Sequence, residues 1–205
     1  MARRDIDLGG LLDLEDFLDA APDITRQAAA NAMNDVIGGP KGLGEYRKAI
    51  SSQVNFPQGY LNDDRFGFDK RAKPGDLTAS LVARQRPTSL ARFASGSSVG
   101  QKGGVRVQVA KGGSGKLFSS AFLVRLRAGT ALDGGNLGLA VRLKPGQTLN
   151  KNDQSRMVHL DANVVLLYGP SIDQVLNNSV AESETPEVLE SVATEFFRQF
   201  ERLNR

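Results

Sequence analysis

The feature that most constrains the fold of this chain is an alternation of apolar and polar residues that is interrupted by glycine-rich turns. Val105, Val107 and Val109 alternate with polar residues, which is typical of a strand with one buried face. The run Lys-Gly-Gly-Ser-Gly at 111–115 predicts a hairpin turn, and 117–126 predicts the partner strand. The centre of the chain is therefore expected to be antiparallel β-structure.

Further strands are predicted at 77–86, 137–143 and 158–167, where apolar residues alternate with polar ones or form a short apolar run. Short glycine-containing turns join several of these segments. Together they indicate one antiparallel sheet of about four to six strands.

Helices are predicted at both ends of the sequence. An amphipathic pattern covers 11–19, and a second helix begins at Pro22 and ends before Gly38-Gly39-Pro40. A short helix is also predicted at 46–54. We therefore expect an α+β fold with N-terminal helices.

The C-terminal segment predicts an amphipathic helix. Ser171 can cap a short helix, and Thr185-Pro186 is a start signal for a longer one. The longer helix has an apolar stripe made of Val188, Leu189, Val192, Phe196, Phe200 and Leu203. This stripe is expected to pack on the chain's own sheet, and a neighbouring subunit is the alternative partner.

Charge is distributed unevenly along the 205 residues, although the net charge is only +3. Residues 1–40 carry a net charge of −5, residues 41–128 carry +11, and residues 129–205 carry −3. Such asymmetry favours head-to-tail association, in which the acidic surface of one subunit meets the basic surface of the next. An ordinary solvated surface is the alternative.

One composite domain of three segments is expected. Residues 1–40 form an N-terminal helical segment, 41–104 form a basic, loop-rich segment with one strand, and 105–205 form the sheet and the C-terminal helix. The stretches 41–75 and 94–104 have few apolar residues. We expect them to be mobile in the free subunit and to become ordered against partners.

Catalytic patterns are weak throughout. Gly115-Lys116 follows a glycine-rich turn, but Leu117 replaces the hydroxyl residue of a phosphate loop and a strand is expected to follow. His159 is the only histidine and the chain has no cysteine. Sites that need two histidines, including most zinc-hydrolase patterns, and thiolate sites are therefore excluded. We expect no enzyme activity, cofactor or metal; a small hydrolase that uses His159 is the weakest alternative.

The basic middle of the chain is the candidate functional surface, because its basic residues alternate with aromatic ones. Such a surface can bind nucleic acid or an acidic protein surface. The candidate interface residues are Lys70, Arg71, Lys73, Arg84, Arg86, Arg92, Phe56, Tyr60, Phe66 and Phe68.

Targeting features are not apparent in the sequence. No apolar run approaches the ~20 residues that span a bilayer, and the N-terminus lacks the apolar core of a signal peptide. We expect a soluble protein without membrane contact that is assembled in the cytoplasm.

Short motifs follow one another in a fixed order over residues 15–205. They are the Ala-rich helix from Pro22, Phe56-Pro57-x-x-Tyr60-Leu61, Lys70-Arg71-Ala72-Lys73, the 77–84 segment, Arg86-Pro87-Thr88, the strands around Ala121 and Val141, and Tyr168-Gly169-Pro170-Ser171. In this order they resemble the minor tail protein Z family of tailed phages, which belongs to the tail-completion and head–tail joining proteins. The glycine-rich segments at 94–104 and 128–136 depart from that pattern.

This resemblance implies a structural role. Similar proteins form a ring at the head-proximal end of the tail or in the neck, and this ring completes the tail for joining to the head. We therefore expect a homo-oligomer, hexameric by analogy, within the virion. Its expected partners are neck, tail-terminator or tail-tube proteins, with non-specific contact to genomic DNA in the lumen. The alternative function is sequence-independent nucleic-acid binding.

Overall fold

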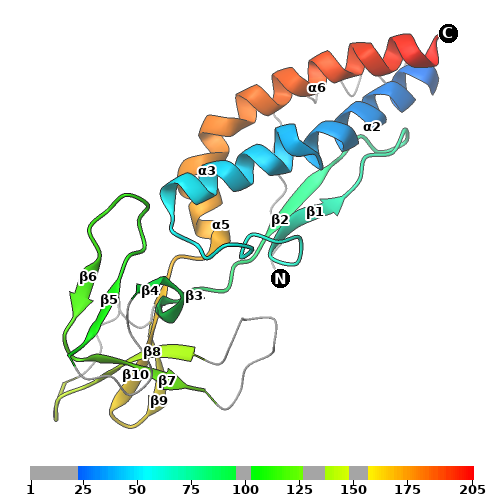
Figure 1. The fold of residues 1–205 in the computed structure, drawn as a ribbon. Coiled ribbons are helices and arrows are strands. Elements are labelled where there is room, and N and C mark those ends of the chain that lie inside the picture. The colour runs from blue at the N-terminus through cyan, green and yellow to red at the C-terminus, as the bar shows by residue number, and fades with distance from the viewer. Residues whose placement is uncertain (1–22, 96–102, 127–136, 148–156) are drawn as a thin grey trace. The chain divides into compact units, whose positions relative to one another are not determined.

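The computed structural model describes residues 23–95, 103–126, 137–147 and 157–205, and these form two compact units (Figure 1). In the described chain, unit 1 contains residues 23–50, 61–85 and 173–205, and unit 2 contains residues 51–60 and those between 86 and 172. The predicted α+β class is confirmed, since helices accompany antiparallel strands. The chain passes between the units four times, so their boundaries do not follow the three predicted segments.

Unit 1 begins with helix α2 (Asp23–Ile37), a π-helical turn η1 (Pro40–Gly44) and helix α3 (Glu45–Gln53). Both helices were predicted at nearly these bounds. The alanines of α2 are buried, with Ala28 and Ala32 fully inaccessible to solvent. Small side chains let neighbouring backbones approach closely, so α2 can serve as the central element of this unit.

Strands β1 (Phe66–Lys70) and β2 (Ser80–Ala83) form an antiparallel hairpin in unit 1. The strand predicted at 77–86 is thus confirmed in its middle part. The expectation of a mobile stretch at 41–75 without a core is wrong, because this stretch contains α3 and β1 and buries Leu43, Tyr46 and Ile50. Most of the 94–104 stretch lies outside the described residues.

The chain is helical from residue 172 to residue 203, and nearly all of this stretch belongs to unit 1. Helix α5 (Ile172–Val175) leads through a π-helical turn η4 (Leu176–Val180) into α6 (Ala181–Leu203). The predicted helix start at Thr185-Pro186 is too late, since both residues lie inside α6. The Thr185 hydroxyl donates to the carbonyl of Ala181, one turn earlier.

Helix α6 packs along α2, in place of the expected packing on the sheet. Figure 1 shows α6 on one side of α2 and the β1–β2 hairpin on the other. Two hydrogen bonds join α2 to the hairpin: the Asn34 side-chain amide donates to the carbonyl of Ala72, and the Ala72 N–H donates to Asn34 Oδ1. Unit 1 therefore has three layers with α2 in the middle.

Unit 2 contains two antiparallel sheets. One has the order β4 (Ala94–Ser95), β5 (Val105–Val107), β6 (Lys116–Phe118), and its β5–β6 hairpin was predicted. The other has the order β3 (Thr88–Ser89), β10 (Val164–Gly169), β8 (Leu137–Arg142), β7 (Ala121–Arg125), with β9 (Met157–Asp161) also paired to β10. A 3₁₀-helix, η2 (Leu90–Phe93), follows β3.

Two predicted strands are each divided in the structure. The stretch 117–126 gives β6 and β7, which belong to different sheets, and the stretch 158–167 gives the hairpin of β9 and β10. The turns are short and contain neither glycine nor proline: Ser119-Ser120 in one case and Ala162-Asn163 in the other. Apolar residues continue on both sides of each turn, so the pattern hides the break.

The β5–β6 hairpin provides a test of close backbone packing. Gly104 has φ +85°, and a Cβ there would lie 2.5 Å from the carbonyl oxygen of Phe118. We expect Gly104→Ala to destabilise unit 2 by about 2–5 kcal/mol, because backbone strain and steric overlap add. Urea unfolding followed by circular dichroism measures the loss.

Gly112 in the same hairpin is the matched control. Its φ is +73°, but nothing lies within 4 Å of a Cβ placed there. Gly112→Ala should therefore cost only the backbone strain, about 1–2 kcal/mol. Equal losses for the two variants would show that the contact with Phe118 does not matter.

Candidate subunit interface

The ten predicted interface residues do not fall in one unit. Unit 1 holds Lys70, Arg71, Lys73, Arg84, Phe66 and Phe68, whereas unit 2 holds Arg86, Arg92, Phe56 and Tyr60. The ten residues that closeness in sequence suggested as one surface are thus divided between the two units. Each part has its own geometry.

The β1–β2 hairpin presents exposed basic side chains. Lys70 forms an ion pair with Asp76 at 2.6 Å, and this hydrogen bond is the main reason that the pKa of Asp76 lies below its ordinary value. The Arg71 guanidinium lies 4.9 Å from the centre of the Phe68 ring, a cation–π contact. Lys73 is exposed in the turn between the strands. The predicted interface residues Lys70, Arg71 and Lys73 are thus exposed at the surface of unit 1.

Phe66 lies at the base of the same hairpin and is fully buried. Arg47 of α3 donates to the carbonyl of Phe66 and to the carboxylate of Asp63, which ties α3 to the start of β1. Phe66 is therefore a core residue of unit 1 and cannot contact a partner.

In unit 2, the predicted aromatic residues pack against one another. The Phe56 and Tyr60 rings are stacked with centroids 5.2 Å apart, and Phe93 lies 5.6 Å from Phe56. Tyr60 is 4% exposed, its hydroxyl is hydrogen-bonded to Thr88, and Arg92 lies over its ring. Burial removes Tyr60 as an interface anchor, and this group stabilises unit 2 internally.

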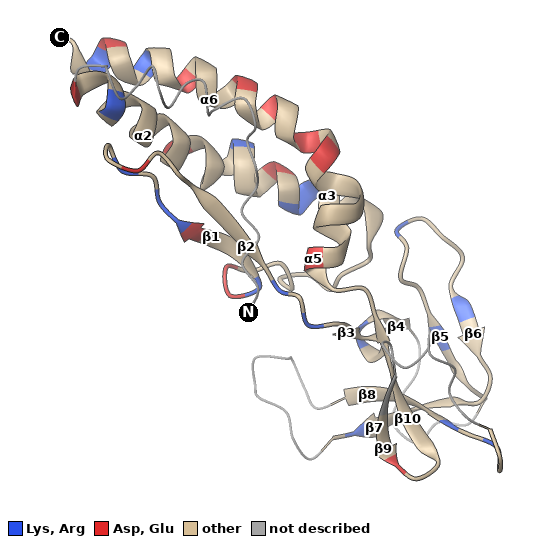
Figure 2. Cartoon of the chain, turned by 180° about the vertical axis from the view of Figure 1, so that it is seen from behind, with Lys and Arg blue, Asp and Glu red and all other residues tan. Residues whose placement is uncertain are grey.

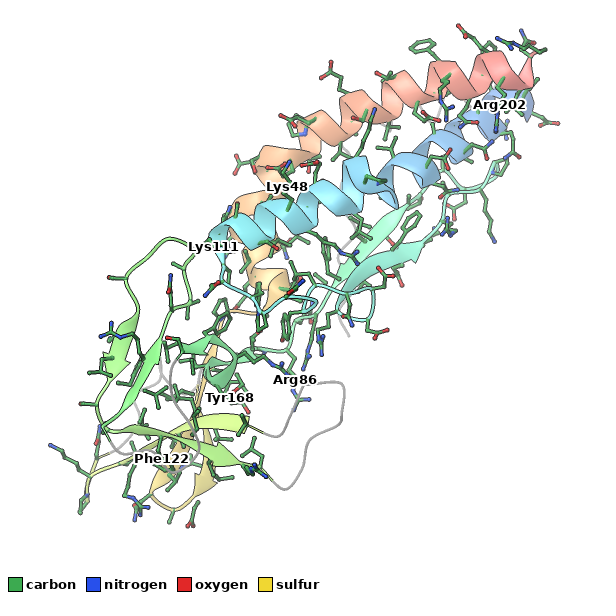
Figure 3. All side chains as sticks on the ribbon, in the orientation of Figure 1. Lys48, Arg86, Lys111, Phe122, Tyr168 and Arg202 are labelled. Carbon is green, nitrogen blue, oxygen red and sulfur yellow. The ribbon has the colours of Figure 1, made fainter. Side chains whose placement is uncertain are left out.

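The two arginines after β2 differ in their surroundings. The backbone of Arg84 donates to the carbonyl of Arg65 and accepts from the N–H of Asp173, so this residue joins the 61–85 and 173–205 stretches of unit 1. Arg86 is exposed (Figure 3). Of the ten predicted residues, we retain Lys70, Arg71, Lys73 and Arg86 as surface-exposed cations.

Helix α6 carries a surface that the sequence analysis missed. Between Ala181 and Phe197 it has five glutamates and neither lysine nor arginine, and red segments mark this part of the helix in Figure 2. Arginine appears only in the last turns, where Arg202 lies (Figure 3). The sequence does contain this pattern, but averaging charge over residues 129–205 concealed it.

The predicted apolar stripe of α6 is buried only in part. Val188 is buried against the rest of unit 1, whereas Phe196 and Phe200 are only half-buried. Phe197, which is not in the predicted stripe, has 64% of its surface exposed. The helix is thus apolar on a wider arc than α2 can cover.

A buried amide links α6 to α2. Gln199 is 1% exposed, and its Nε2 donates to Asp35 of α2 and to Glu195 of α6 at 2.9 and 2.6 Å. Arg198 also donates to Glu195, and this hydrogen bond is the main cause that lowers the pKa of Glu195. One amide therefore holds two carboxylates and fixes the register of the two helices.

A second polar contact lies nearer the start of α6. Tyr46 of α3 is 2% exposed, and its hydroxyl is hydrogen-bonded to the Thr185 hydroxyl at 3.0 Å. Burial is the largest cause that raises the pKa of Tyr46. The neutral phenol is thus the form that suits the folded unit.

His159 lies in β9 opposite Val165, and its side chain is exposed. Among the described residues, no group of three His, Cys, Asp or Glu side chains is arranged to hold a metal ion. No helix of the described chain is both long and apolar enough to cross a membrane.

Comparison with family models, curated proteins and solved structures gave no match. The resemblance to the phage Z family accordingly stays a prediction from the motifs.

The buried amide between α2 and α6 yields a pH-dependent prediction. Gln199→Glu would place a third carboxylate beside Asp35 and Glu195, and we expect it to destabilise unit 1 by about 3–5 kcal/mol at pH 7. Burial and repulsion raise the pKa of such a carboxyl, so the difference from the wild type should shrink as the pH falls and the group is protonated. Thermal unfolding at pH 7 and pH 5 measures this.

Gln199→Met is the matched control for shape. It loses the amide hydrogen bonds but adds no charge, so it should lower the free energy of unfolding by about 1–2 kcal/mol. This loss should change much less between pH 7 and pH 5 than the loss caused by Gln199→Glu. A Gln199→Glu protein as stable as the Met variant at pH 7 would contradict the placement of the amide between two carboxylates.

Proposed function

We propose that this chain is a structural virion protein of a tailed phage. It forms a ring at the head-proximal end of the tail or in the neck, which completes the tail and joins it to the head. The order of motifs along the chain supports the family, and the charge distribution on unit 1 supports self-association.

The separation of charge across unit 1 is the observation that carries this proposal. The glutamate-rich part of α6 lies on one side of α2, and the β1–β2 hairpin lies on the other (Figure 2). The hairpin exposes Arg71 and Lys73 at its turn, whereas Lys70 is paired with Asp76. Opposite charges on different sides of one folded unit favour head-to-tail contacts between identical subunits. Head-to-tail contacts produce a closed ring when the rotation between subunits allows closure.

Ring formation can be tested by reversing the hairpin charges. Arg71→Glu with Lys73→Glu should raise the protein concentration for half-assembly at least about tenfold, because like charges would then face each other. Analytical ultracentrifugation measures assembly, electron microscopy shows whether rings form, and circular dichroism confirms folding.

Lys111→Glu with Lys116→Glu is the matched control, since it changes the net charge equally on exposed residues of the β5–β6 hairpin. It should assemble nearly as the wild type does. A wild-type chain that stays monomeric at high concentration and is not incorporated into phage particles would refute the proposed function.

The second candidate is sequence-independent nucleic-acid binding, favoured by the stacking of Arg71 on Phe68 beside exposed Lys73. If it holds, duplex DNA binds the wild type and the Lys111/Lys116 control alike. Arg71→Glu with Lys73→Glu then weakens binding and reduces the slope of log affinity against log salt by about 0.9 per lost phosphate contact. Fluorescence anisotropy at several salt concentrations gives this slope, and absence of binding near physiological salt removes the candidate.

A further inference from the structure

Three phenylalanines near the end of α6 form a continuous aromatic edge, which we call the phenylalanine ridge: Phe196, Phe197 and Phe200. Phe196 meets Phe197 edge-on with centroids 5.4 Å apart and lies 6.1 Å from Phe200. Phe197 is the most exposed large apolar side chain in the described chain. Its exposed surface lies beside half-buried rings, so the ridge is a ready site for an apolar or cationic partner.

Carboxylates border the ridge. Glu190 and Glu201 are exposed and stand seven residues before and four residues after Phe197, which places all three on one stripe of the helix. An aromatic surface between carboxylates attracts cations through two interactions: the cation–π interaction with the ring faces and the electrostatic attraction of the carboxylates. The ridge therefore fits a basic segment with some apolar surface.

The turn of the β1–β2 hairpin has this chemistry. We call residues 71–75 the basic turn; it contains Arg71, Lys73 and the exposed Pro74. The turn is held in shape by two backbone hydrogen bonds between Lys73 and Asp76. A preformed turn loses little conformational freedom on binding, which favours it as an occupant.

We propose that the phenylalanine ridge of one subunit binds the basic turn of a second copy of this chain. The inference rests on the proposed function and names the two surfaces that meet in the ring. Since α2 separates the ridge from the basic turn within unit 1, each copy offers one surface to each neighbour. The contact is heterologous, with Phe197 as its apolar anchor.

Disulfide cross-linking tests this contact directly, because the chain has no cysteine of its own. Thr194→Cys lies one turn before Phe197, and Gly75→Cys lies in the basic turn, where a Cβ meets nothing within 4 Å. A mixture of the two full-length variants should give a mixed disulfide dimer, while each variant alone should give little. Adding Phe197→Ala to the Thr194→Cys chain should reduce the mixed product at least about tenfold.

Leu117→Ala, which truncates another exposed apolar residue, is the control and should leave the mixed product unchanged. A prevailing disulfide between two Thr194→Cys chains would assign the ridge to a like-with-like contact and overturn the proposal. A mixed product that appears only after removal of residues 1–19 would assign the ridge to that segment, with the same consequence.

The proposed function and this inference can fail separately. Rings or particle incorporation without the mixed disulfide would overturn the ridge contact and leave the ring intact. A mixed disulfide from a chain that never enters particles would support the ridge contact and overturn the role in the virion.

Discussion

The packing of α6 along α2 is the contact on which unit 1 depends. The alanine-rich surface of α2 allows close approach, and the buried amide of Gln199 sets the register by joining Asp35 to Glu195. Since α2 is also bonded to the hairpin through Asn34, it holds two surfaces of opposite charge at a fixed separation.

The sequence predicted the α+β class, helices α2 and α3, and the β5–β6 hairpin, because periodicity and glycine turns are local properties. It did not predict the partner of α6. An amphipathic pattern indicates that one face of a helix is buried, but it does not identify the element that covers this face. The division of 117–126 and of 158–167 into two strands each was also hidden. In both, a two-residue turn without glycine or proline interrupts an apolar pattern that then continues.

For the candidate interface, too, the sequence did not show which residues the fold brings together and which it buries. Closeness in sequence grouped ten residues that the fold distributes over two units, and it could not tell that Tyr60 and Phe66 are buried. Aromatic residues between basic ones resemble a binding surface whether they point outward or into a core. Phe197 is the opposite case, because its exposure depends on how much of α6 the neighbouring helix covers.

The division of the chain also bears on how the protein is made. Unit 1 needs residues 173–205, so its helix pair cannot form until that late stretch has left the ribosome. All residues of unit 2 lie between 51 and 172, so it can fold earlier. The glutamate-rich face of unit 1 therefore forms only after residues 173–205 have been made, well after the β1–β2 hairpin that carries the other face.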